Sequence, residues 1–136
     1  MAIRFLAELN VYQSLKDQTS GCFAEFLGAG DLICSSVLPA GYVLLLEKVP
    51  GVICSDEMLE NPRLRTLLET RLRSAILALR NAGFVHGDPV KSNVMVDAAG
   101  ARVVLLDFEH AVPNVYGIGA EDYSEVSEIM APPFRM

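Results

Sequence analysis

Two polar motifs in this chain lie directly beside two short apolar runs. The sequence HGDPVKSN at residues 86–93 precedes the apolar run 94–96, and Asp107, in the sequence DFE, follows the apolar run 103–106. Both runs have the length of short strands, and the small residues between them, at 98–100, predict a tight turn. An antiparallel hairpin would bring Asp88, Asn93 and Asp107 to the same end.

Two carboxylates and one amide in that place favour the chemistry of phosphoryl transfer. The reaction needs one carboxylate to orient the acceptor hydroxyl, and an amide with a second carboxylate to hold Mg²⁺ on the phosphates. Asp88, Asn93 and Asp107 supply this set of groups. The spacing of the motifs therefore predicts a phosphotransfer site.

The same residues resemble the protein-kinase-like superfamily, which includes the eukaryotic protein kinases and the aminoglycoside and choline phosphotransferases. His86, Asp88 and Asn93 match the catalytic-loop pattern H-x-D-x-x-x-x-N, and DFE stands where protein kinases carry D-F-G. The HGD variant and the acidic residue after Asp-Phe are more typical of small-molecule kinases and of fungal kinase-like proteins. The resemblance implies ATP- and Mg²⁺-dependent transfer of a phosphoryl group to a hydroxyl acceptor.

The resemblance also implies a role for each matching residue. Asp88 would be the catalytic base, His86 a structural support of the catalytic loop, and Asn93 and Asp107 the metal ligands. Lys91 is a further candidate catalytic residue, although it lies three residues after Asp88, whereas protein-serine kinases usually place this lysine two residues after. The acceptor is either a small molecule or a protein, and no residue discriminates between them.

Segments upstream of the motifs extend the resemblance. Apolar residues at spacings of three and four predict an amphipathic helix over residues 62–81, which would lead into the catalytic loop. The segment 42–51 resembles the strand and hinge that hold adenine through backbone groups. This similarity assigns Glu47, Lys48 and Val49 to the nucleotide.

A first helix is predicted over about residues 4–16. It carries Glu8 at a place resembling the glutamate that pairs with the phosphate-binding lysine of the family. No lysine precedes Glu8, and no glycine-rich loop precedes it either. The glycines at 28 and 30 follow the helix and predict a turn between strands.

We therefore expect an α+β fold, a partial protein-kinase-like domain over residues 1–112. It would contain an incomplete N-lobe sheet with one helix, the hinge, the central helix and the catalytic hairpin. Residues 113–136 would form a C-terminal tail with room for one short helix, over about 121–130. Because most of the C-lobe is absent, the chain looks truncated at both ends relative to the family.

Composition and charge bear on the partners of this chain. Eleven basic and 17 acidic residues among 136 give a net charge of −6. Nucleic acid and anionic membrane surfaces are therefore not expected partners, because both are bound mainly by basic surfaces. The apolar stretches are too short to cross a membrane, and the start of the chain lacks a signal-peptide pattern, which predicts a cytoplasmic protein. Apolar surface that longer relatives cover would be available to a partner protein.

Three cysteines, Cys22, Cys34 and Cys54, lack the paired spacing of a zinc site and are expected to be free thiols.

A rival interpretation takes His86, Asp88 and His110 as the two histidines and one carboxylate of a non-haem iron oxygenase. That site normally rests on a jelly-roll of about eight strands, more than this sequence offers. A second alternative is a non-catalytic, pseudokinase-type binding module or a gene fragment, which the missing lysine supports.

Overall fold

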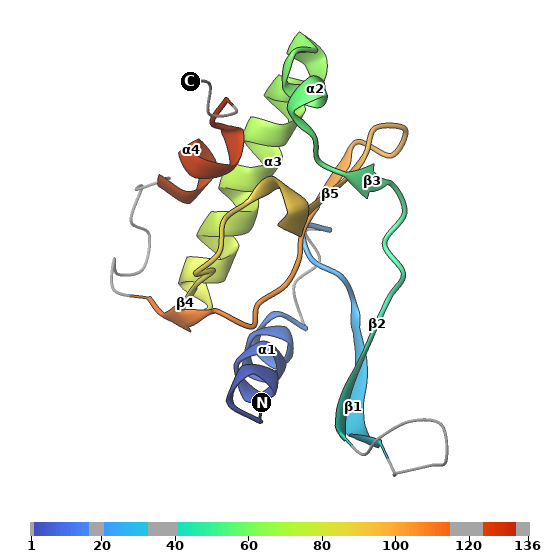
Figure 1. Cartoon of the computed structure of the whole chain (residues 1–136), viewed down its shortest axis with the longest axis vertical. Coiled ribbons are helices and arrows are strands. Elements are labelled where there is room, and N and C mark those ends of the chain that lie inside the picture. Colours follow the sequence, from blue (N-terminus) through green and yellow to red (C-terminus); the bar gives the residue numbers. More distant parts are fainter. Residues whose placement is uncertain (1, 17–20, 33–40, 115–123, 133–136) are drawn as a thin grey trace.

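The computed structural model describes residues 2–16, 21–32, 41–114 and 124–132. Its elements in chain order are α1 (Ala2–Leu15), β1 (Phe26–Leu32), β2 (Gly41–Leu46), β3 (Val52–Ile53), α2 (Asp56–Leu59), α3 (Pro62–Asn81), β4 (Phe84–Val85), the 3₁₀ turn η1 (Lys91–Asn93), β5 (Val94–Asp97), β6 (Arg102–Leu105), β7 (Val112–Pro113) and α4 (Ser124–Met130). The described strands form three small antiparallel sheets, β1–β2, β3–β5–β6 and β4–β7. This mixture of helices and small sheets (Figure 1) confirms the predicted α+β class.

Helix α3 lies at the centre of the fold and has the bounds that the sequence pattern predicted. The Asn61 side chain caps its start by accepting hydrogen bonds from the N–H groups of Arg63 and Leu64 at 3.0 and 3.4 Å. Proline in the first turn adds no unsatisfied donor, and Gly83, at a φ of 103°, follows the last turn. One face of the helix is buried through Leu68, Leu72, Ala75, Ile76 and Leu79.

The predicted hairpin is formed by β5 and β6, which pair from Val94–Leu105 to Asp97–Arg102. In the turn between them the Asp97 carboxylate accepts a hydrogen bond from the Gly100 N–H at 3.2 Å. The alternating side chains Val94, Val96, Val103 and Leu105 join the core and hold one face of the hairpin on it. Val104, on the opposite face, is buried as well. Strand β3 pairs with the outer edge of β5.

Helix α1 lies next to a two-stranded ribbon formed by β1 and β2 (Figure 1). The predicted turn at residues 28–30 is wrong, because these residues lie inside β1, after a β-bulge between Phe26 and Gly28. A Cβ atom at Gly28 or Gly30 would meet nothing within 4 Å, so glycine is tolerated on a face that no side chain covers. Leu44 and Leu46 of β2 pack against the core instead.

Helix α4 is attached to α3 by a buried ion pair as well as by apolar contacts. Arg80 on α3 and Glu125 on α4 are 2.7 Å apart, with side chains 0% and 6% exposed. Val126 and Ile129 join the core from the same helix. The helix falls within the predicted range 121–130, of which 121–123 lie outside the described residues. The domain boundary after residue 112 stays a prediction, and strand β7 spans it.

Apolar side chains are exposed on the ribbon and on β3. Leu27, Tyr42 and Leu45 are 60%, 56% and 57% exposed, and Val52 is 58% exposed. Cys22 and Cys54 are both buried, and the Cys22 thiol is directed to the Arg71 carbonyl at 3.9 Å, whereas Cys34 lies outside the described residues. Within the described ranges, no helix combines the length and the apolar character needed to cross a membrane.

We expect Glu125→Gln to lower the free energy of unfolding by about 3–5 kcal/mol, because it removes the buried carboxylate that pairs with the Arg80 guanidinium at 2.7 Å. Urea denaturation would measure the loss. Glu128→Gln is the matched control, since it removes the same charge from an exposed position of the same helix. Equal stability of the two variants would show that the ion pair does not hold α4 in place.

Candidate active site

The structure brings Asp88 and Asn93 into direct contact at the end of the hairpin. The Asn93 side-chain amide donates to the Asp88 backbone oxygen at 3.0 Å and to its carboxylate oxygen Oδ2 at 3.3 Å. Asp107 follows Leu106, whose N–H donates to the Asn93 carbonyl at 2.7 Å. Strands β5 and β6 therefore place the three predicted groups at one end of the hairpin.

His86 links the loop at residues 86–93 to the end of β6. Its Nε2 is 2.8 Å from the Leu106 carbonyl, and its Nδ1 accepts the Asp88 N–H at 3.1 Å. An acceptor at Nδ1 and a carbonyl at Nε2 require the neutral tautomer with the proton on Nε2. The ring is fully buried and packs edge-on against Phe108, with ring centroids 5.4 Å apart. His86 is thus placed to support the loop, because both of its ring nitrogens are engaged by the backbone and neither is available to a substrate hydroxyl.

Asp107 has a backbone conformation that is uncommon for a residue with a side chain. Its φ is 62°, in the left-handed region. The next residue, Phe108, is fully buried among the rings of Tyr12, Phe23 and His86, at centroid distances of 5.1, 6.0 and 5.4 Å. Burial of Phe108 fixes the chain on one side, so the strained conformation of Asp107 is imposed by the surrounding core.

Glu8 of α1 lies beside Asp107, which the sequence pattern did not predict. Its carboxyl lies near the Phe108 N–H. Partial burial, and then the negative charge of Asp107, raise the pKa of Glu8 above its ordinary value. Burial likewise raises the pKa of Tyr12, with further contributions from Glu8 and Asp107. A cation bound at Asp107 would relieve the repulsion between the two carboxylates.

The groups around Asn93 and Asp107 fit a magnesium ion. The NH₂ group of Asn93 donates to Asp88, and the side-chain oxygen of Asn93 has no hydrogen bond among the described residues. That oxygen can therefore bind a cation. One carboxylate oxygen of Asp107 accepts a hydrogen bond from the Glu109 N–H at 3.4 Å, and the other has no hydrogen bond among the described residues. Two protein ligands are the usual number where phosphate oxygens and water complete the shell.

The iron-site interpretation does not fit this geometry. Both ring nitrogens of His86 are occupied by hydrogen bonds to the backbone, so neither can bind a metal. His110 is 3.2 Å from Glu109 and does not join His86 and Asp88. Among the described residues, no three His, Cys, Asp or Glu side chains gather in a way that could hold a metal ion.

Lys91 is directed away from the predicted acceptor position. Its ammonium donates to the Ala131 carbonyl at 2.6 Å and pairs with Asp56 at 3.2 Å. It therefore ties η1 to the start of α2 and to the chain after α4. The described contacts do not bring Lys91 to Asp88, and its catalytic role stays a prediction without geometric support.

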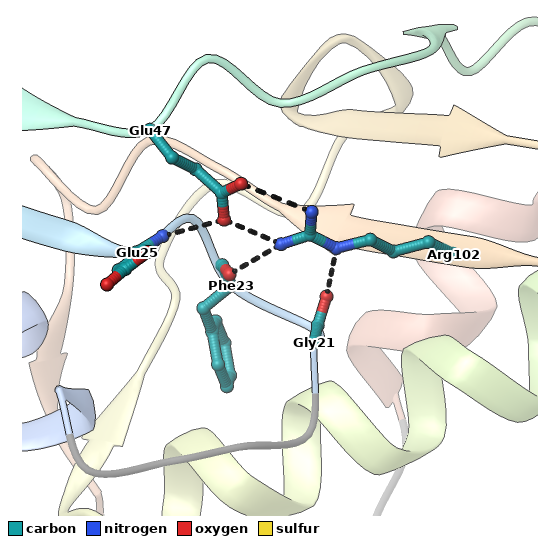
Figure 2. A network of polar contacts seen from close by, with 5 residues as sticks. All are labelled: Gly21, Phe23, Glu25, Glu47 and Arg102. Atoms are coloured by element: carbon teal, nitrogen blue, oxygen red, sulfur yellow. Dashed lines mark hydrogen bonds and ion pairs between the residues drawn. The ribbon is translucent and has the colours of Figure 1, made fainter. Parts of the chain in front are cut away.

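The hinge segment, residues 47–49, is held firmly at its first residue. The Glu47 N–H donates to the Glu25 carbonyl at 2.9 Å, and its carboxylate accepts the Glu25 N–H at 2.9 Å. The Arg102 guanidinium donates to both carboxylate oxygens, at 2.7 and 3.3 Å (Figure 2). Lys48 and Val49 have no backbone hydrogen bond among the described residues, so their N–H and C=O groups are available to a ligand.

The Arg102 hydrogen bond lowers the pKa of Glu47 below the ordinary value of a carboxyl. Since the pKa is lower in the folded chain, the pair contributes stability at neutral pH, and this contribution is lost as the pH falls through the folded-state pKa.

Met95 is a candidate binding residue that sequence reasoning missed. It follows Asn93 by two residues and is half-exposed, between the buried Val94 and Val96. Its partner across the strands is Ile53, which is 46% exposed. Together they form an apolar surface next to the hinge segment. In the structure, buried and partly exposed residues alternate along β5. The sequence of this run is apolar throughout, so it does not show that Met95 faces outwards.

We expect Gly87→Ala to destabilise the protein by about 1–3 kcal/mol more than Gly83→Ala. Both glycines have positive φ, 87° and 103°, so both variants carry the backbone strain of a side chain in that region. Only at Gly87 would the added Cβ collide with a neighbour, the His110 carbonyl oxygen. Thermal and urea denaturation of the pair would isolate this close approach, and equal losses would argue against it.

Comparison with known proteins independently supports the resemblance to phosphotransferases. Residues 55–116 match the family model of APH, the phosphotransferase enzyme family. A search of curated proteins returned no match, whereas 116 chains of solved structures match. One is a co-crystal structure of WbdD and the kinase inhibitor LY294002, with 27% identity and a TM-score of 0.57. The similarity covers 85% of this chain and 25% of that one, so this chain spans about a quarter of its relative. The family match and the shared structure place the chain in the protein-kinase-like superfamily.

Proposed function

We propose that this chain carries the metal-binding and acceptor-orienting part of an ATP- and Mg²⁺-dependent phosphotransferase. The observation that carries the proposal is the contact between Asn93 and Asp88, with Asp107 at the adjacent end of β6. It orients one carboxylate and leaves one amide oxygen free, as acceptor orientation and metal binding require. The match to the phosphotransferase family model supports the same chemistry.

Asp88 is proposed to accept the proton of the acceptor hydroxyl. Its carboxylate is half-exposed, and one oxygen is held by Asn93, so the other can face an incoming group. The hydroxyl oxygen forms a bond to the γ-phosphorus of ATP, the bond to the bridging oxygen breaks, and ADP leaves. The acceptor is a hydroxyl group of a small molecule or of a protein.

Asn93 and Asp107 are proposed to hold Mg²⁺ against the phosphates. When bound, the ion would neutralise the negative charge on the phosphate oxygens. The carboxylates of Glu8 and Asp107 give this place a negative potential, which favours a cation. Asp107 is presented by a strained backbone conformation between the hairpin and the buried Phe108, so its position is fixed before the ligand arrives.

The nucleotide base is proposed to bind between the hinge segment and β5. The backbone groups of Lys48 and Val49 can hydrogen-bond the edge of adenine, and Met95 with Ile53 can contact its face. An apolar contact surface with a few free polar groups is the usual form of such a pocket.

A non-catalytic nucleotide-binding module is the second candidate function. It is favoured by the carboxylate of Glu8, for which the described contacts include no lysine. Lys91 is engaged with Asp56 and Ala131 instead. Absence of a preorganised phosphate-binding charge typically lowers the rate by about 10²–10³. Binding of nucleotide without transfer would support this alternative.

We expect Asp107→Ala to abolish the Mg²⁺-dependent part of ATP binding and to leave adenosine binding unchanged. Its carboxylate is proposed to contact only the metal, so the base should be bound as before. Calorimetric titration with ATP, with and without Mg²⁺, and with adenosine would measure both effects. Glu109→Ala is the matched control, since it removes a neighbouring carboxylate that pairs with His110. Mg²⁺-dependent binding that survives in Asp107→Ala would contradict the assignment.

We expect Asp88→Asn to retain Mg²⁺–ATP binding and to slow turnover by about 10²–10⁴, the usual contribution of a general base. Turnover can be followed by the release of ADP from ATP, with water or an added alcohol as acceptor. Unchanged turnover in this variant would remove Asp88 from the mechanism. A wild-type chain that binds Mg²⁺–ATP without any turnover would favour the non-catalytic alternative.

A further inference from the structure

Arg102 joins three segments that are distant in sequence. From β6, its Nε donates to the Gly21 carbonyl at 2.8 Å and one terminal nitrogen donates to the Phe23 carbonyl at 3.2 Å. The same guanidinium binds the two oxygens of Glu47, the first hinge residue, at 2.7 and 3.3 Å. Figure 2 shows the guanidinium between the loop after α1 and the hinge segment.

This contact is better oriented than an ordinary surface ion pair, because the two groups meet through two hydrogen bonds. Arg102 and Glu47 meet as a bidentate pair, with side chains 26% and 27% exposed. Bidentate pairs fix the relative orientation of the two groups as well as their distance. Two further N–H groups of Arg102 donate to the Gly21 and Phe23 carbonyls, so the side chain is held at several points.

The hinge segment is consequently fixed at both ends. Glu47 is held by Arg102 and by two hydrogen bonds with Glu25, one between backbone groups and one from the Glu25 N–H to the Glu47 carboxylate. On the other side, Gly51, at a φ of 115°, lies so close to the Val96 backbone that no Cβ would fit, and Val52 pairs with Val96. Lys48 and Val49 lie between these two anchors with free backbone groups.

Arg102 also connects the hinge to the proposed metal ligand. It opens strand β6, which ends at Leu105, and Leu106 then leads from the strand to Asp107. The Leu105 N–H donates to the Cys22 carbonyl at 2.9 Å, so β6 and the loop after α1 are joined by backbone as well. The groups proposed to bind adenine and the group proposed to bind the metal are thus positioned by the same strand.

We propose that Arg102 is a positioning residue, which holds the hinge segment at a fixed place relative to Asp107 and so keeps the nucleotide site formed before ATP binds. This inference rests on the proposed function. Without the guanidinium, the hinge would occupy its binding conformation only part of the time, and the apparent affinity would fall in proportion to that fraction.

The test compares wild-type protein with Arg102→Met, Arg102→Lys and Glu47→Gln, using adenosine and Mg²⁺–ATP as probes. We expect Arg102→Met to weaken the binding of both probes by about tenfold, to the same extent, if the binding conformation falls to about a tenth of the population. The metal-ligand variant Asp107→Ala should weaken Mg²⁺–ATP alone. Arg102→Lys should restore part of the affinity, because it keeps the charge without the bidentate contact.

Two further readouts separate positioning from general stability. In Arg102→Met, the KM for ATP should rise with little change in kcat, since the chemical groups are untouched. Amide hydrogen exchange at Glu47, whose N–H is bonded to Glu25, should become faster. Arg73→Met removes an arginine from the exposed Arg73–Glu69 pair and should change none of these quantities.

Wild-type protein that binds neither probe would overturn the proposed function and this inference with it. Wild-type binding that is unchanged in Arg102→Met would overturn the inference alone. Loss of Mg²⁺–ATP binding with normal adenosine binding would also overturn it, because the hinge contacts the base. If Arg102→Met does not fold, Arg102→Lys and Glu47→Gln decide by the same criteria.

Discussion

Both backbone groups of Leu106 are hydrogen-bonded to the loop that carries Asp88, and the geometry of the candidate site depends on this joint. Its N–H donates to the Asn93 carbonyl at 2.7 Å, and its carbonyl accepts from His86 at 2.8 Å. Because Leu106 precedes Asp107, the position of the second carboxylate follows from that of the loop. His86 is fully buried, so loss of its partner would leave a buried polar group unsatisfied, at a cost of about 1–3 kcal/mol. The position of the candidate site is therefore fixed by its hydrogen bonds to the buried part of the chain.

Polar contacts over long distances in sequence complement this joint. Arg80 and Glu125 are 45 positions apart, and Arg102 and Glu47 are 55 positions apart. Apolar burial holds the helices and the hairpin together without strong directional preference. The ion pairs add direction, because a guanidinium and a carboxylate bind well only in a narrow range of geometries. One pair sets the place of α4 on α3, and the other sets the place of the hinge on β6.

Local signals were enough to predict the elements that form the site. Helix α3 was predictable from its apolar spacing, with Asn61 and Pro62 at its start and Gly83 after its end, and the hairpin from two apolar runs around a turn. The same reasoning failed at Gly28 and Gly30, because glycine also occurs inside strands, often beside a bulge, and these two lie in β1, paired with β2. The contact of Glu8 with Phe108 was beyond prediction for a similar reason, since it joins α1 to a segment 100 positions away.

By itself, the sequence determined which chemical groups are present and which short elements carry them: two carboxylates and an amide at the end of a hairpin, after a capped amphipathic helix. Only the tertiary structure decided which of these groups are available. In the fold, the NH₂ group of Asn93 donates to Asp88, and the amide oxygen stays available. Lys91 pairs with Asp56, and Glu47 pairs with Arg102. The physical reason is that local propensity acts over a few residues, whereas the partner of a polar side chain is chosen by whatever the fold places within about 3 Å of it.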